Sequence, residues 1–290
     1  MINIQSRIGG RQENQDFYGT AKTKFGDLIV VCDGMGGHNG GRYAAELAVN
    51  TILKFIETTP ETEPQNALQN AINEANTTIW NEAHANPEFK NMGTTVTALL
   101  ITPEKAIACH VGDSRIYQIR KGEIIFRTFD HSHVFELVKA GLLTEEEART
   151  STKSNIITRA LGIKQSVEID TTDNLVYQIG DRFLLCTDGI WGMLPEGELI
   201  EFISQPIDTE TLIANLVVKI DALGIENGGK HDNLTAALIE IDTNYIKTET
   251  LKTPKVKQKE SFFSFFNKLF SKKHKKIQTD ENLQNWKKSG

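Results

Sequence analysis

The chain has 290 residues, of which 39% are hydrophobic and 24% charged, with a formal net charge of −6. These values are typical of a soluble globular protein with a sizeable core, and no apolar run approaches the roughly 18–20 residues that cross a bilayer. Residues 1–7 lack the apolar segment of a secretory signal, so we expect a cytoplasmic protein.

The apolar pattern predicts strands and helices that alternate along one domain. In chain order, the predicted elements are a strand over 28–32, helices over 41–57 and 64–85, strands over 94–101, 106–111, 115–120, 123–129 and 182–186, a helix over 209–224 and a strand over 234–241. The strands are rich in Val, Ile and Thr, and Lys121-Gly122 indicates a hairpin. Pro64 suits a first helical turn. Hairpin-linked strands and long helices predict an antiparallel sandwich with helices packed outside.

The charge distribution separates the C-terminal part from the rest. Residues 245–290 carry 12 lysines and 4 acidic residues, which leaves an acidic body. An acidic body with a basic tail is not typical of a nucleic-acid-binding domain. We expect a catalytic domain over 1–243, a polar linker over 244–260 and a basic amphipathic tail over 261–290.

The tail combines aromatic residues with a lysine cluster at 272–276. On a helix, most of its apolar residues would share a face: Phe262, Phe263, Phe266, Leu269 and Phe270. This pattern favours weak docking to an anionic membrane surface or to a protein. A short helix folded back on the body and a disordered end are the alternatives.

Three cysteines, Cys32, Cys109 and Cys186, lie apart in strand-like runs. Their odd number and wide spacing argue against a disulfide framework and against a zinc site. We expect buried, reduced thiols.

Two strand-like runs end in the same pair of residues, Asp33-Gly34 and Asp188-Gly189. A buried strand is rigid and therefore holds an acid at its end in a fixed place. The glycine allows a sharp turn or a close approach to a ligand. The two acids predict one shared metal site at the open end of a sheet.

Glycines and carboxylates cluster in five places, each beside a strand-like run: Arg11–Asp16, Asp33–His38, Gly112–Arg115, Thr187–Gly189 and His231–Thr235. Each cluster alone could be structural, because Asp-Gly is a common turn. All five in this order, with Gly93-Thr94-Thr95 and residues 157–162, resemble the metal-dependent protein phosphatase family, the type 2C serine/threonine phosphatases, in its bacterial form. The resemblance extends from about residue 6 to residue 241.

The resemblance implies an α+β fold, a four-layer α-β-β-α sandwich with two antiparallel sheets flanked by helices. It also implies a site for two Mn²⁺ or Mg²⁺ ions, which prefer the oxygen donors that these motifs offer. Two such ions lower the pKa of a bridging water and offset charge on the phosphoryl oxygens. The implied reaction is hydrolysis of phosphoserine and phosphothreonine by direct attack of this water, without a phosphoenzyme.

The resemblance also assigns the metal ligands. Asp33 would bridge the two ions, with the carbonyl of Gly34 completing the second ion and with Asp188 and Asp232 holding the first. We expect Gly189 only to turn the chain. A third, weaker ion would be held by Asp113, shared with Asp188.

Two further residues would act on water and substrate. Asp16 would orient metal-bound water, and Arg11 would bind the substrate phosphate through two hydrogen bonds, which suits guanidinium geometry. Met35 stands where many eukaryotic relatives carry a histidine as general acid. Residues 135–155 resemble a mobile flap beside the active site. Because substrate is read there, substrate choice is the property of the family that is least safely carried over to this chain.

The leading hypothesis is a phosphatase that acts on phosphorylated proteins and counteracts a bacterial serine/threonine kinase. Alternatives are a phosphatase of a sigma-factor regulator pathway and an inactive phosphopeptide-binding relative. The inactive relative is disfavoured because Asp33, Asp188 and Asp232 are all present. We expect no nucleic-acid partner. The tail would place a cytoplasmic enzyme peripherally at the inner membrane face.

Overall fold

The structure, a computed structural model, describes residues 2–36, 40–151, 153 and 155–245. The chain divides into two units, residues 1–247 and 248–290. The predicted tail and all but the first two residues of the predicted linker lie outside the described residues. In the part that the structure describes, no helix is long and apolar enough to cross a membrane.

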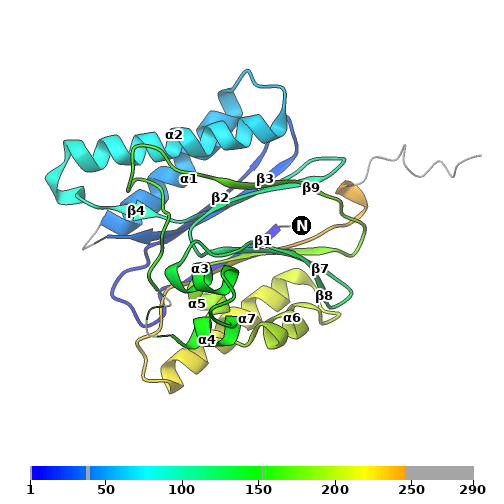
Figure 1. Cartoon of the computed structure of the whole chain (residues 1–290). Coiled ribbons are helices and arrows are strands. Elements are labelled where there is room, and N and C mark those ends of the chain that lie inside the picture. The colour runs from blue at the N-terminus through cyan, green and yellow to red at the C-terminus, as the bar shows by residue number, and fades with distance from the viewer. Residues whose placement is uncertain (1, 37–39, 152, 154, 246–290) are drawn as a thin grey trace, which may run out of the picture. The chain divides into compact units, whose positions relative to one another are not determined.

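Two antiparallel sheets form the centre of the first unit (Figure 1). One sheet has the order β2 (Asp16–Lys22), β3 (Asp27–Met35), β5 (Val96–Ile101), β6 (Ala106–Val111) and β9 (Asp170–Leu175), with the short β4 (Gly93–Thr94) paired to β3. The other has the order β1 (Ile2–Arg7), β11 (Leu234–Glu240), β10 (Arg182–Cys186), β7 (Arg115–Arg120) and β8 (Glu123–Arg127).

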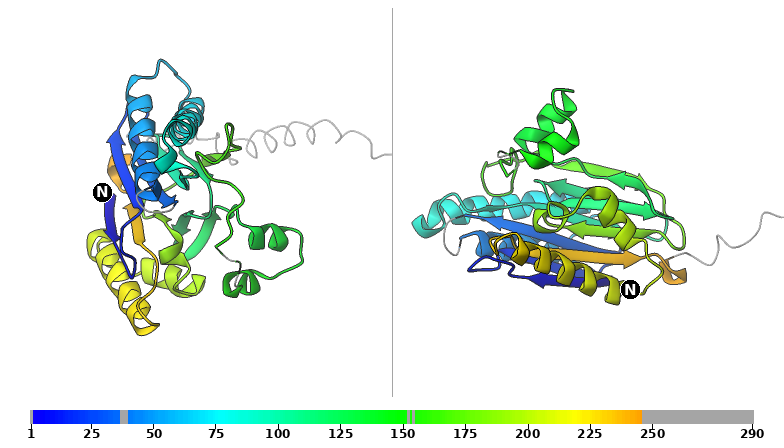
Figure 2. Two further views of the ribbon diagram at one scale, coloured as in Figure 1. Left: turned by 90° about the vertical axis from the view of Figure 1, so that its left-hand side faces the viewer. Right: turned by 90° about the horizontal axis from the view of Figure 1, so that it is seen from below.

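Helices cover the outer faces of both sheets. α1 (Gly40–Thr58) and α2 (Pro64–Ala85) pack on the first sheet, whereas α5 (Asp188–Trp191), α6 (Glu196–Ile203) and α7 (Thr209–Glu226) pack on the second. The short α3 (His133–Lys139) and α4 (Glu145–Thr150), green in Figure 2, project from the sandwich. The predicted α-β-β-α arrangement is confirmed.

Side-chain alternation along the strands explains why the layers form. On β3, Leu28, Val30 and Cys32 face the α1–α2 layer, and Ile29 and Val31 face the space between the sheets. Successive strand residues point to opposite faces, so a strand buried on both sides needs apolar residues at every position. Asp33 comes next on the side that faces the other sheet, at the edge of this inner core.

Most predicted elements lie where the sequence places them, including β6, β7, β10 and α2 with their bounds unchanged. Lys121 and Gly122 have φ angles of 51° and 82° and form the predicted hairpin turn. The predicted strand 94–101 is interrupted at Thr95. All three cysteines are free and buried, as expected.

Candidate metal centre

The predicted site lies where one end of the first sheet meets the second sheet. Asp16 begins β2 and is the register partner of Asp33 on β3. The hydroxyl of Thr187, which follows β10 in the other sheet, donates to Asp16 Oδ2 at 3.0 Å. Both acids are therefore fixed at the boundary between the two sheets.

Two threonines fix the backbone of Asp33. Its N–H donates to Thr95 Oγ1 at 2.9 Å, and its carbonyl accepts from Thr94 Oγ1 at 2.9 Å and from Thr95 N–H at 2.8 Å. The interruption at Thr95 thus serves the site, because Thr95 bonds to Asp33 from both its backbone and its side chain.

Gly34 lies where the start of α1 meets β3. A Cβ atom at this position would lie 2.0 Å from the carbonyl oxygen of Gly41, so a larger residue would push helix and strand apart. The N–H of Gly34 donates to the carbonyl of Gln15 at 3.2 Å. A side chain is excluded here.

Asp188 is the first residue of α5, and Gly189 is the second. A Cβ atom at Gly189 would lie 2.0 Å from the carbonyl oxygen of Asn233. The φ angle of Gly189 is not in the left-handed region, so no turn requires a glycine at this position. The expectation that Gly189 only turns the chain is therefore wrong. Its lack of a side chain lets α5 approach the segment that carries Asp232.

Asp232 lies beside Arg11 in the structure. Arg11 donates to Asp232 Oδ2 at 2.6 Å, and both side chains are partly exposed. The neighbouring Asn233 donates to the carbonyls of Ile8 and Glu13 at 2.8 and 2.9 Å. The Asn233 side chain therefore anchors the loop that carries Arg11 beside the predicted ligands.

Asp113 lies in the loop that crosses from β6 in the first sheet to β7 in the second. The side chain is buried, and the preceding Gly112 has a φ angle of +107°, which favours glycine. A Cβ atom at Gly112 would also lie 2.6 Å from the Thr95 side chain.

Burial, together with the negative charges of neighbouring aspartates, raises the pKa values of four of these acids, Asp16, Asp33, Asp113 and Asp188. Burial raises the pKa of Asp16 to about 7 and that of Asp188 to about 6, and Asp232 adds to both. The pKa values of Asp33 and Asp113 are also raised well above the ordinary value by burial. The negative charges of the other four aspartates raise the pKa of Asp33 further. The structure therefore brings all five predicted acids together.

The donor set fits divalent cations. Asp16 Oδ1 and Asp188 Oδ1 are buried and accept no hydrogen bond from the described residues. Burying a charged oxygen without a partner is unfavourable, and a cation between these groups would remove that cost. Clustered carboxylate oxygens suit Mg²⁺ or Mn²⁺.

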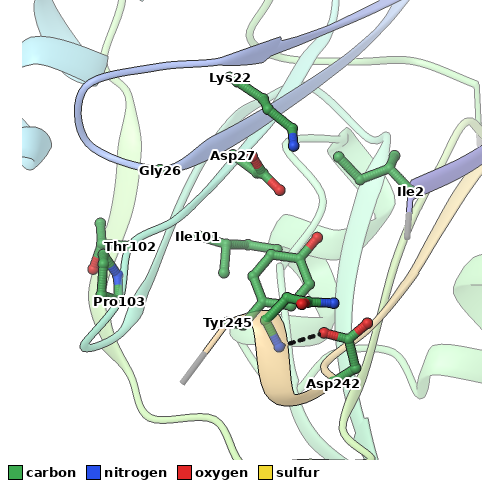
Figure 3. Close-up of a pocket in the computed structure, with 10 residues that line it drawn as sticks. Ile2, Lys22, Gly26, Asp27, Ile101, Thr102, Pro103, Asp242 and Tyr245 are labelled. Carbon is green, nitrogen blue, oxygen red and sulfur yellow. Dashed lines mark hydrogen bonds between the residues drawn. The ribbon is translucent and has the colours of Figure 1, made fainter. Parts of the chain in front are cut away.

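A cavity of about 620 Å³ lies at the other end of β3, away from these acids. Its lining includes Gly26 and Asp27, where β3 begins, and Tyr245 (Figure 3). The clustered aspartates are not among its lining residues, so this cavity is separate from the candidate site.

The segment over 135–155 contains α4 and all but the first two residues of α3, and sequence periodicity predicted neither helix. Each short helix has an N-cap, with Ser132 accepting from Phe135 N–H and Thr144 forming a capping box with Glu147. Arg127 of β8 donates two hydrogen bonds to Glu145 at 2.7 and 2.8 Å. The capping motifs are the signal that could have located both helices.

Comparisons with known proteins identify the family of the chain. Residues 5–217 match the family described as protein phosphatase 2C. The serine/threonine phosphatase stp of Listeria monocytogenes is 33% identical over 237 residues, which are 80% of this chain and 92% of the relative. The crystal structure of serine/threonine phosphatase Stp1 from Staphylococcus aureus is similar with a TM-score of 0.75 and 30% identity, and the match covers 83% of this chain and 94% of that one.

A second solved structure contains metal. It is the catalytic domain of serine/threonine protein phosphatase PstP in complex with two manganese ions, and it is similar with a TM-score of 0.70 and 28% identity. The match covers 83% of this chain and 98% of that one. The chain belongs to the protein phosphatase 2C family.

Proposed function

We propose that this protein is a metal-dependent phosphatase that hydrolyses phosphoserine and phosphothreonine in proteins. The observation that carries the proposal is the convergence of five aspartates from both sheets, four of them with raised pKa values. The names of the Listeria and Staphylococcus relatives support the same activity.

Two Mn²⁺ or Mg²⁺ ions would be held by Asp33 as the shared ligand, by the carbonyl of Gly34, and by Asp188 and Asp232. Asp113 would hold a third, weaker ion. When bound, such ions make water a stronger nucleophile and neutralise phosphate charge.

The chain's own residues would orient water and substrate. Asp16, fixed by Thr187, would accept a hydrogen bond from the attacking water. Arg11 would donate two hydrogen bonds to the phosphate. Met35 has no proton to donate, so the leaving group would take its proton from water.

The experiment measures hydrolysis of an aryl phosphate and of a phosphothreonine peptide with Mn²⁺, with chelator and in the Asp188→Asn variant. We expect chelator to abolish both activities and Asp188→Asn to lower kcat/KM roughly 100-fold or more, as for the loss of a major electrostatic contribution. Asp173→Asn on β9, whose side chain pairs with Lys105, is the matched control and should retain activity. Activity insensitive to both chelator and Asp188→Asn would refute the proposal.

We also propose two finer assignments from the sequence. The substrates would be products of a serine/threonine kinase, and phosphoproteins that accumulate when the enzyme is deleted would identify them. The aromatic and lysine-rich residues 261–290 would bind weakly to anionic membranes, which sedimentation with anionic vesicles tests.

A further inference from the structure

Asp113 is held by contacts on both sides of its Cα atom. On one side, the carbonyl of Gly112 accepts from the backbone N–H of His131 at 2.9 Å. On the other, the carbonyl of Asp113 accepts from the indole N–H of Trp191 at 3.0 Å. With both flanking peptide groups fixed, rotation about the Asp113 backbone bonds is restricted, and the direction of its carboxylate is restricted with it.

The His131 side chain adds a third contact. Its Nδ1 accepts from the N–H of Gly112 at 3.1 Å, and its ring is fully buried. Because Nδ1 accepts, the ring proton must lie on Nε2, which is 3.3 Å from a carboxylate oxygen of Asp170. Asp170 thus stabilises the His131 tautomer that is protonated on Nε2, which leaves Nδ1 free to accept from the N–H of Gly112.

His131 is close to His110 and Asp170, a trio whose donor atoms lie within 4.8 Å of one another. The trio is nevertheless arranged for hydrogen bonding rather than for an ion. The two imidazole rings are stacked at 4.5 Å with an interplanar angle of 20°, so their in-plane lone pairs do not converge. The guanidinium of Arg159 already donates to Asp170 Oδ1 at 2.7 Å, so this carboxylate has a cationic partner within the protein.

Trp191 is oriented by a buried cation. The guanidinium of Arg115 lies 3.6 Å from the centre of the indole ring and makes two hydrogen bonds to Asp130, at 2.7 and 2.8 Å. The edge of Phe135 completes this packing, with ring centres 6.5 Å apart. Trp191 also lies one helical turn after Asp188 on α5. The indole thus connects the helix that begins with Asp188 to the loop that carries Asp113.

We propose that His131 and Trp191 are positioning residues that direct the carboxylate of Asp113 toward Asp188 by fixing the peptide groups around it. This inference rests on the proposed function, in which Asp113 holds a third, weaker ion. Neither side chain touches that ion; each acts on it through the Gly112–Asp113 backbone. Groups that orient metal ligands in this way affect metal affinity strongly.

The test is calorimetric titration of the full chain with Mn²⁺, in which Asp113→Asn identifies the weak binding event. We expect Trp191→Phe, which keeps an aromatic ring but loses the N–H donor, to weaken this event roughly 10–100-fold and to leave the tighter ions unchanged. We expect His131→Ala to do the same. His131→Asn should restore most of the affinity, because its amide oxygen can replace Nδ1 as acceptor. Trp80→Phe on α2 is the control and should bind like the unchanged protein.

Tryptophan fluorescence gives a second readout, which keeps Trp191 in place and so does not depend on the folding of Trp191→Phe. In a Trp80→Phe, Trp286→Phe background only Trp191 emits. Paramagnetic Mn²⁺ should quench it over the concentration range of the weak event, and Mg²⁺ should not. His131→Ala should move this quenching to higher Mn²⁺ concentration, and His131→Asn should move it back.

The outcomes separate this inference from the proposed function. Loss of the weak event in Asp113→Asn but wild-type affinity in Trp191→Phe and His131→Ala would overturn the positioning role alone. A weak event unchanged in Asp113→Asn would overturn the third-ion site and this inference with it. Neither result would touch the two-ion phosphatase activity, which the chelator and Asp188→Asn test independently.

Discussion

Asp16 and Asp188 each bury one carboxylate oxygen without a hydrogen-bond donor among the described residues. Without bound cations, these groups oppose folding at neutral pH. Their pKa values in the folded protein, about 7 and about 6, lie above the ordinary value of 3.8. A carboxyl group shifted upward on folding stabilises the folded state fully below about pH 4, and this contribution is lost as the pH rises toward 7.

We therefore expect the chelated protein to be more stable at pH 5.5 than at pH 8. Asp188→Asn removes one buried charge and should raise the unfolding temperature of the chelated protein at pH 8, by ~2–4 °C per kcal/mol gained. Thermal unfolding followed by circular dichroism from pH 5 to 8 measures this, with Asp173→Asn as control. A higher unfolding temperature at pH 8 than at pH 5.5 in the chelated protein would contradict the expectation.

The meeting of Asp33 and Asp188 at one end of the sheets was predictable from the sequence, because each comes directly after an apolar run that forms a buried strand. The roles of the individual acids came from the resemblance to the phosphatase family and stay predictions. The groups that orient them were harder to identify. Thr187 and Trp191 act through contacts with residues far away in the chain, Asp16 and Asp113 respectively. Such pairings depend on the docking of the two sheets and have no local signature.

A further prediction concerns the side chain of Arg11. Its guanidinium contacts Asp232, and in the proposed function it binds the substrate phosphate. Charge-assisted hydrogen bonds contribute about 1.5–3 kcal/mol, so Arg11→Ala should lower kcat/KM for a phosphothreonine peptide by roughly 10–100-fold, mainly through KM. Steady-state kinetics at saturating Mn²⁺ check this, with Arg11→Lys expected to be intermediate. An unchanged KM in Arg11→Ala would exclude a phosphate-binding role.

At the scale of elements, close approaches between helices and strands set the geometry of the site. Gly34 lets α1 start against β3, and Gly189 lets α5 lie against the backbone of Asn233. Neither approach to a neighbouring backbone is visible in the sequence, from which we expected Gly34 to supply a carbonyl ligand and Gly189 only to turn the chain. Three strands are missing from the prediction, β1, β2 and β9, and each has a weak signal. β1 has no fully buried residue, β2 contains Gly19 beneath Val49 and Leu53 of α1, and β9 is polar over most of its length.

Gly189→Ala should displace α5 from the segment that carries Asp232 and so disturb the ligands Asp188 and Asp232 together. We expect a loss of about 1–3 kcal/mol in stability, as for overpacking, and weaker Mn²⁺ binding. Gly197→Ala on α6 is the matched control. A Cβ atom there meets nothing within 4 Å, so this variant should gain about 0.4–1 kcal/mol. Urea unfolding and calorimetry check both variants, and equal behaviour would contradict the assigned role of Gly189.

At the scale of the whole molecule, the described site is contained within the first unit, residues 1–247. A chain ending at Lys247 should therefore keep its kcat/KM for an aryl phosphate within about twofold, since no ligand or supporting residue is removed. Sedimentation with anionic vesicles should distinguish the two forms, with binding only by the full chain. A large loss of aryl phosphate hydrolysis on truncation would show that the C-terminal residues contribute to catalysis.

The convergence of aspartates from both sheets on one site has a consequence beyond catalysis. Ions held by Asp33 on one side and by Asp188 and Asp232 on the other would fasten the two layers at one end of an inner core that otherwise depends on apolar burial. The layers could not separate without releasing the ions, so the free energy of metal binding would add to the free energy of unfolding. Scarcity of manganese or magnesium would then shorten the lifetime of the protein as well as stop its chemistry.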